Sequence, residues 1–128
     1  MSHRSRLAGF IIDCQTDDLA PAARFWSQAL GASIADPDAG DVPGTYAQFG
    51  DTRDGLHIEV QKVDHPSRVH LDIESDDIDA EAARLEKLGA KKIAYVKRWW
   101  VMEAPTGQRF CVVKMHHPEL GTPPTTWD

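Results

Sequence analysis

The order of strands and helices in the chain can be predicted first from residues 68–90, RVHLDIESDDIDAEAARLEKLGA. Residues 69–73 alternate apolar and polar side chains, which is the two-residue period of a half-buried strand. Residues 75–77 then offer helix-capping side chains, and apolar residues recur at helical spacing until Gly89. Residues 91–96 return to an extended pattern. The stretch therefore predicts a strand, a helix and a second strand in succession.

The same order occurs in the first half of the chain. Residues 7–13 form an apolar, Ile-rich run, and the helical pattern after it closes at Leu30-Gly31-Ala32, which corresponds to Leu88-Gly89-Ala90. Further strands are predicted at residues 33–35, 45–49 and 56–63 in the first half and at 92–96, 99–103 and 109–115 in the second. We predict one domain made of two β-α-β-β-β modules, residues 7–63 and 67–115, with a C-terminal tail at residues 116–128.

Composition narrows the class of protein. With 128 residues, 41% hydrophobic and 27% charged, the chain is typical of a soluble globular domain. It has neither the run of about eighteen apolar residues needed to cross a membrane nor a secretory cleavage pattern, so we expect a cytoplasmic protein without a membrane partner. Two cysteines are too few for a disulfide framework, although a bridge between them stays open. The net charge of −6 argues against nucleic acid as a partner.

Two such modules, a helix ending in Leu-Gly-Ala and the pair Phe25-Trp26 in the first helix resemble the vicinal oxygen chelate superfamily, which includes glyoxalase I, extradiol dioxygenases and bleomycin-resistance proteins. The resemblance covers residues 7–115, and residues 69–72 and 104–107 are most similar to small bacterial glyoxalase-like proteins. It implies an α+β fold in which the modules curl eight strands of mixed sheet into a cup with helices on the outer face. It also implies a homodimer, because many relatives build the cup from two chains.

In that superfamily a metal is held from the first, fourth, fifth and eighth strands. These positions fall here on Ile11, Glu59, His70 and Cys111, where the usual set is His, Glu, His and Glu. The resemblance therefore implies a degenerate metal site in which only Glu59 and His70 are retained, either as metal ligands or as an acid/base pair. A bound ion would be zinc, nickel, iron or cobalt.

Strand alternation indicates which other side chains share the inner face. Glu59 lies on the polar side of its strand, and so does His70. The same alternation gives the candidate ligand-binding residues Asp13, Gln61, Asp72, Arg109 and Cys111. In a closed cup, imidazole, carboxylate and thiolate groups would converge and suit a borderline divalent ion. Two simpler alternatives are a hydrogen bond between Glu59 and His70 in a polar cavity, and a face that is merely solvated.

The adjacent Trp99 and Trp100 must point to opposite faces of their strand. We expect Trp100, with Met102 on the same face, to line the cup and stack on a flat or apolar ligand, while plain core packing is the alternative. Four histidines show no partner pattern and are interpreted as surface residues: His57, His65, His116 and His117.

Together these observations favour a glyoxalase-like protein with a degenerate metal site that binds or transforms a small organic ligand. One alternative is a metal-dependent lyase, isomerase or dioxygenase that uses Glu59 and His70. Another is a non-catalytic drug-binding protein of the resistance type, and a third is a sheet domain that serves only for association. The isoleucine at position 11 favours metal-independent function, because its side chain cannot donate to a metal.

Overall fold

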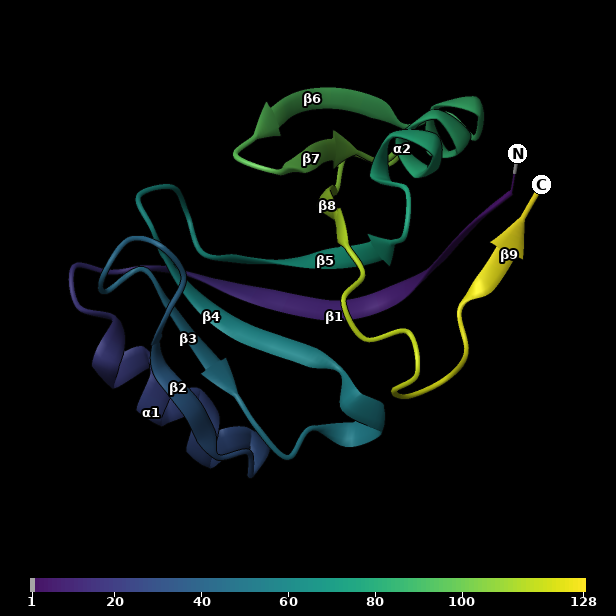
Figure 1. The fold of residues 1–128 in the computed structure, drawn as a ribbon. Coiled ribbons are helices and arrows are strands. Elements are labelled where there is room, and N and C mark those ends of the chain that lie inside the picture. Colours follow the sequence, from purple (N-terminus) through teal and green to yellow (C-terminus); the bar gives the residue numbers. More distant parts are fainter. Residues whose placement is uncertain (1) are drawn as a thin grey trace. The chain divides into compact units, whose positions relative to one another are not determined.

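The computed structural model describes residues 2–128, which divide into two compact units (Figure 1). The first comprises residues 10–69 and is called here the 10–69 unit. The second comprises residues 70–128 together with the N-terminal residues up to Gly9 and is called the 70–128 unit. Strand β1 (His3–Gln15) runs through both. The predicted α+β class is confirmed, because each unit contains one α-helix and several β-strands.

The 10–69 unit has the strand order β2-β3-β4-β1 with helix α1 packed on it. Its elements are α1 (Leu19–Leu30), β2 (Ile34–Ala39), β3 (Tyr46–Phe49), the short 3-10 helix η1 (Arg53–Gly55) and β4 (His57–Val63). Helix α1 begins at Asp18, whose side chain accepts a hydrogen bond from the Ala20 N–H, and ends at Gly31 with a φ of 67°, as the sequence predicts. Strand β2 extends past its predicted end at residue 35, through register shifts against β3.

Burial alternates along β4. Ile58 and Val60 are buried in a cluster with residues of α1, among them Leu19 and Ala23. The intervening side chains of the strand therefore lie on the face of the sheet that α1 does not cover. Glu59 is one of them, so this face is the one on which candidate functional residues must be sought.

The 70–128 unit has the strand order β1-β5-β8-β7-β6, and β9 pairs with β1. Its elements are β5 (Arg68–Ser75), α2 (Ile78–Lys87), β6 (Lys91–Val96), β7 (Trp99–Glu103), β8 (Arg109–Lys114) and β9 (Thr125–Trp127). Strands β5 and β8 are parallel, whereas β7 is antiparallel to both β6 and β8. Met102, Phe110 and Val112 are buried in one cluster with α2. The opposite face of β8 is therefore not covered by the helix.

A buried charge network links α2 to both ends of the chain. Glu81 has no exposed surface, accepts two hydrogen bonds of 2.8 Å from Arg84, and lies 2.8 Å from Nε2 of His3. The Trp127 ring lies against the Arg84 guanidinium at 3.8 Å and donates through Nε1 to Ser5. Burial raises the pKa of Glu81, but hydrogen bonds from Arg84, His3 and Ser5 outweigh it and hold the pKa below its ordinary value.

Arg6 fixes the loop of residues 117–122. Its guanidinium donates hydrogen bonds of 2.6–2.8 Å to the carbonyl oxygens of His117, Leu120 and Thr122. Its Nε donates to Glu74 at 2.6 Å. The residues that the sequence predicts to be a tail therefore include a loop tied to β1 and a strand paired with it.

Replacing Arg6 by alanine is expected to speed cleavage after Glu119 by glutamyl endopeptidase about ten-fold, because the loop loses its backbone contacts and opens more often. Mass spectrometry of the released C-terminal fragment measures the rate. Arg4→Ala is the matched control, since Arg4 pairs with Asp76 where the two side chains are 43% and 37% exposed and the pair is partly screened by water. Equal cleavage rates in the two variants would show that Arg6 does not hold the loop.

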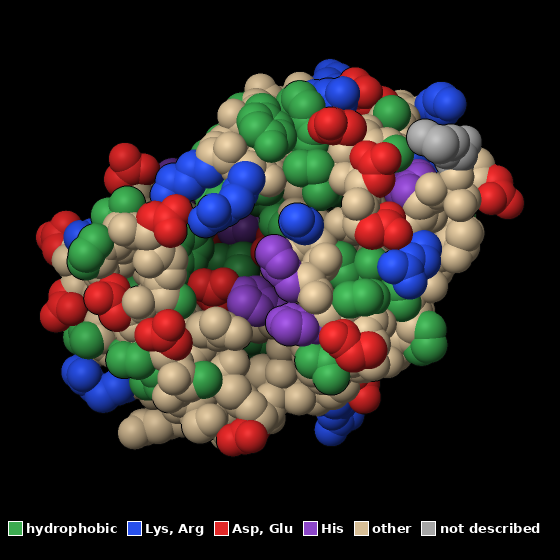
Figure 2. Space-filling view, in the orientation of Figure 1, with side chains coloured by type: hydrophobic (Ala, Val, Ile, Leu, Met, Phe, Trp, Pro, Cys, Tyr) green, Lys and Arg blue, Asp and Glu red, His purple; other side chains and the backbone are tan. Residues whose placement is uncertain are grey.

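The surface of the molecule carries charges of both signs. Figure 2 shows acidic and basic side chains interspersed over the face drawn. Among residues 2–128, no helix is both long enough and apolar enough to span a membrane.

Candidate functional site

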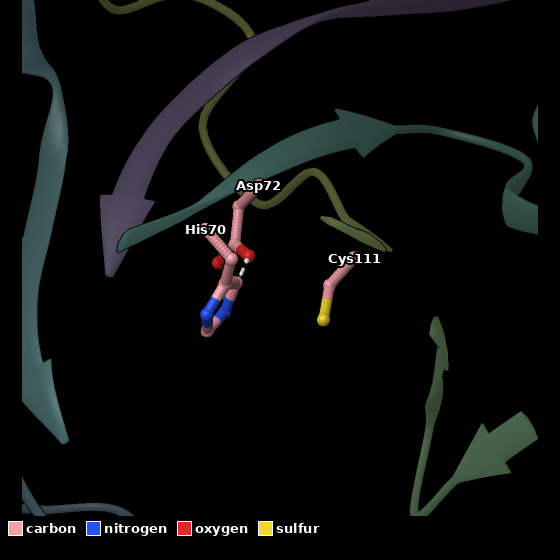
Figure 3. Close-up of side chains that lie close together, drawn as sticks. All are labelled: His70, Asp72 and Cys111. Carbon is pink, nitrogen blue, oxygen red and sulfur yellow. Dashed lines mark ion pairs between the residues drawn. The ribbon is translucent and has the colours of Figure 1, made fainter. Parts of the chain in front are cut away.

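Three side chains with metal-binding donors lie together on the face of the 70–128 sheet that α2 does not cover (Figure 3). His70 and Asp72 are alternate residues of β5, and Asp72 pairs with Cys111 across the parallel strands β5 and β8. One donor atom from each residue can be chosen so that all three lie within 4.8 Å of one another. Nε2 of His70 and Oδ1 of Asp72 are 3.6 Å apart.

The electrostatic character of this cluster favours a cation. The His70 and Asp72 side chains are only 13% and 12% exposed, so the carboxylate is held largely away from water. A buried carboxylate costs free energy unless a positive group compensates it. Beside the contact with His70 at 3.6 Å, a metal ion bound between the imidazole, the carboxylate and the sulfur would add to that compensation.

The donor distances fit a metal site. A tetrahedral zinc site with bonds of about 2.0–2.3 Å needs donors roughly 3.3–3.8 Å apart. The separations of up to 4.8 Å are therefore within reach of small side-chain rotations. Three protein donors of this kind leave a coordination position for a ligand, as in catalytic zinc sites. The sequence predicted His70 as a metal ligand and placed Cys111 at a metal-ligand position of the superfamily, whereas Asp72 was predicted only to contact a small-molecule ligand.

Glu59, the other predicted metal ligand, belongs to the 10–69 unit. Its carboxylate is hydrogen-bonded to Nε2 of His57, and Nδ1 of His57 lies 3.5 Å from the amide nitrogen of Gln48. The interpretation of His57 as a residue without a partner is therefore wrong, while its side chain is 39% exposed at the surface. The signal was present in the sequence, because residues two apart on a strand share a face. The role of Glu59 as a metal ligand stays a prediction.

Asp13 and Gln61 also belong to the 10–69 unit. Asp13 is 2% exposed, and one of its carboxylate oxygens lies 3.6 Å from Nε of Arg68. Burial and the negative charge of Asp13 raise the pKa of the neighbouring Cys14 thiol, which favours its protonated form. Gln61 lies opposite Tyr46 in the register of β3 and β4. Ligand binding by Asp13 and Gln61 stays a prediction.

The predicted role of Trp100 and Met102 is wrong, and the packing alternative is correct. Met102 has no exposed surface and lies in the cluster with α2, while Nε1 of Trp100 donates to Asp79 of that helix at 2.9 Å. The error arises because the sequence does not reveal the register between β7 and β8. Val101 is the residue of β7 that pairs with Cys111, so Val101 and Trp99 share the face of His70, Asp72 and Cys111.

Arg109 lies on that same face of β8, two residues from Cys111. Its Nε donates to Oε1 of Glu103 at 3.2 Å, and its side chain is 37% exposed. Ligand binding by Arg109 and Cys111 stays a prediction.

Comparisons with known proteins agree with this fold. A family model described as "Glyoxalase-like domain" matches residues 9–113. Methylmalonyl-CoA epimerase from Mycobacterium tuberculosis has a TM-score of 0.62 at 16% identity, over 86% of this chain and 87% of that chain. The Mn(II)-bound glyoxalase from Novosphingobium aromaticivorans has a TM-score of 0.60 at 17% identity, over 89% of this chain and 40% of that one.

A third structure, a glyoxalase/bleomycin resistance protein/dioxygenase superfamily member from Vibrio splendidus, has a TM-score of 0.55 at 16% identity, over 87% of this chain and 99% of that chain. At these identities the likeness shows the fold alone. No curated protein matches the sequence.

Proposed function

Because this chain belongs to the glyoxalase-like domain family, we propose that it binds a divalent metal ion through His70, Asp72 and Cys111 and thereby holds a small, oxygen-bearing organic ligand. The observation that carries the proposal is the convergence of three different donors on one face of a sheet. The Mn(II)-bound glyoxalase, 40% of which is similar in fold to this chain, supports it, since that protein binds a metal ion.

The donor set narrows the choice of metal. Thiolate and imidazole favour zinc, cobalt, nickel or iron, whereas sites of oxygen donors alone suit magnesium, calcium or manganese. When bound, such an ion supplies Lewis acidity toward an oxygen atom of the ligand. The protein holds the donors on adjacent, hydrogen-bonded strands and limits the access of water to the two side chains of β5. Val101 and Trp99 on β7 offer the ligand an apolar surface on the same face.

Elemental analysis of protein purified without a tag or chelator tests this proposal. We expect close to one equivalent of metal in the native protein and a loss of most of it in His70→Ala, because one of three donors is removed. His117→Ala is the control, since His117 is 71% exposed and lies outside the cluster. A native protein that takes up no metal, even after incubation with zinc, nickel and iron, would rule the proposal out.

The hydrogen bond between Glu59 and His57 favours a second candidate function, metal-independent proton transfer. A carboxylate that orients an imidazole can assist removal of a proton from carbon next to a carbonyl group. This function would survive in His70→Ala and would be lost in Glu59→Gln. The homodimer and the cytoplasmic location inferred from the sequence stay predictions.

A further inference from the structure

Arg109 combines a position next to the metal-binding cluster with unused hydrogen-bonding capacity. Two residues along a strand correspond to about 7 Å, so Arg109 emerges one pleat away from Cys111 on the same face. Within residues 2–128, the Nε contact with Glu103 is its one hydrogen bond and ion pair. Its two terminal nitrogens are therefore available to a ligand, and the side chain is 37% exposed.

The acidic residues of this face have compensating partners of their own. Glu74, on the same face of β5 as Asp72, pairs with Arg6 at 2.6 Å. Glu103 pairs with Arg109, and Asp72 lies 3.6 Å from Nε2 of His70 within the donor cluster. An anionic ligand is therefore not opposed by an uncompensated carboxylate on these strands, and it meets a guanidinium with both terminal nitrogens open.

We propose that Arg109 recognises the carboxylate of the ligand, and that the ligand is a small oxo- or hydroxy-carboxylic acid whose second oxygen function reaches the cluster of His70, Asp72 and Cys111. This inference rests on the proposed metal-dependent function. A guanidinium presents paired N–H donors in a plane, which matches the two oxygens of a carboxylate. Because Arg109 lies one pleat from Cys111 on the same face, the ligand carries its carboxylate and its second oxygen function at two separate positions of its carbon chain. Val101 would contact the carbon chain between them.

Matched pairs of ligands isolate the carboxylate. We would titrate zinc-loaded protein by calorimetry with 4-oxopentanoate and with 4-oxopentanamide, and likewise with 4-hydroxybutanoate and its amide. Each pair is nearly isosteric and differs in charge. A charge-assisted bidentate contact at a partly exposed arginine is expected to favour the acid about ten-fold. Arg109→Gln should abolish that preference, Arg109→Lys should retain part of it, and Arg24→Gln, an exposed arginine on α1, should leave it unchanged.

A second variant separates recognition from a merely structural role. Glu103→Gln removes the carboxylate that competes for Arg109, so it should strengthen binding of the acids several-fold while affecting the amides little. If Arg109 only stabilised the pairing of β7 and β8, Glu103→Gln would weaken or leave unchanged the binding of both ligand types.

The outcomes distinguish this inference from the proposal beneath it. Zinc binding is measured separately in every variant, and a native protein that binds no zinc overturns both. Zinc binding without a preference for either acid over its amide overturns the role of Arg109 and leaves the metal site standing. The same holds if neither acid binds the zinc-loaded protein.

Discussion

Replacement of Glu81 by alanine is expected to lower the free energy of unfolding by about 3 kcal/mol, since it removes one side of a buried charge pair. The carboxylate is fully buried and satisfies donors from Arg84 and His3. Without it, the Arg84 guanidinium, 24% exposed, is left without its anion. The network also positions Trp127, whose ring lies against that guanidinium, so the loss should loosen the pairing of β9 with β1.

Urea unfolding at neutral pH, followed by tryptophan fluorescence, measures this loss. Glu86→Ala on the same helix is the matched control, because Glu86 is 44% exposed and its nearest cation, Lys92, lies 3.5 Å away. An exposed pair of this kind contributes at most about 1 kcal/mol. Equal destabilisation by the two substitutions would contradict the importance of the buried network.

The pH dependence of stability in the native protein and in Glu81→Gln tests the direction of the Glu81 pKa shift. The pKa of folded Glu81 is held below its ordinary value of 4.5. A carboxylate with a lowered folded pKa stabilises the protein fully above its unfolded pKa, and that stabilisation is lost as pH falls through the folded pKa. The stability difference between the native protein and Glu81→Gln should therefore be constant near neutrality and shrink below about pH 4.5. A difference that grew on acidification would have the wrong sign.

Cys111→Ser is expected to weaken cobalt binding at least about 100-fold, because even the loss of an outer-shell partner costs a metal site about 10–100-fold. Cys111 supplies the sulfur of the three-donor cluster. The sulfur-to-cobalt charge-transfer absorption of the native protein should disappear with it, since a serine oxygen gives no such band. Titration with cobalt, followed by absorption spectroscopy, measures the affinity and the identity of the donor together.

Cys14→Ser is the matched control for this experiment. Cys14 is the second cysteine of the chain, and its thiol has a raised pKa and donates to the carbonyl oxygen of Ile12. It should therefore keep both the affinity and the absorption band. A band that survives in Cys111→Ser and vanishes in Cys14→Ser would move the metal site away from the proposed cluster.

The sequence predicted those features that depend on neighbouring residues. The helix start at Asp18 and its end at Gly31 follow from side-chain capping and from the left-handed conformation that glycine adopts readily. The alternation of His70 and Asp72 on one face of β5 follows from the period of a strand. Each of these features depends on residues that are close in the sequence, so it can be predicted without knowledge of the fold.

Features that depend on pairing between distant strands were not predicted. Trp100 was placed on the ligand side because alternation along β7 does not reveal which of its side chains share a face with Phe110 and Val112 of β8. Likewise, no residue near His3 or Arg6 in the sequence indicates their partners. His3 contacts Glu81, 78 residues away, and Arg6 contacts Glu74, 68 residues away. Such contacts depend on tertiary structure, and local patterns do not encode them.

The division of β1 between two units has a consequence for the order in which the chain can fold during synthesis. Residues 10–69 follow one another without interruption, so the ribosome delivers this unit complete. His3 leaves the ribosome 78 residues before its partner Glu81, a wait on the order of several seconds at typical elongation rates. His3 therefore lacks this partner until helix α2 has been synthesised, and the N-terminal residues complete their contacts only with the later part of the chain.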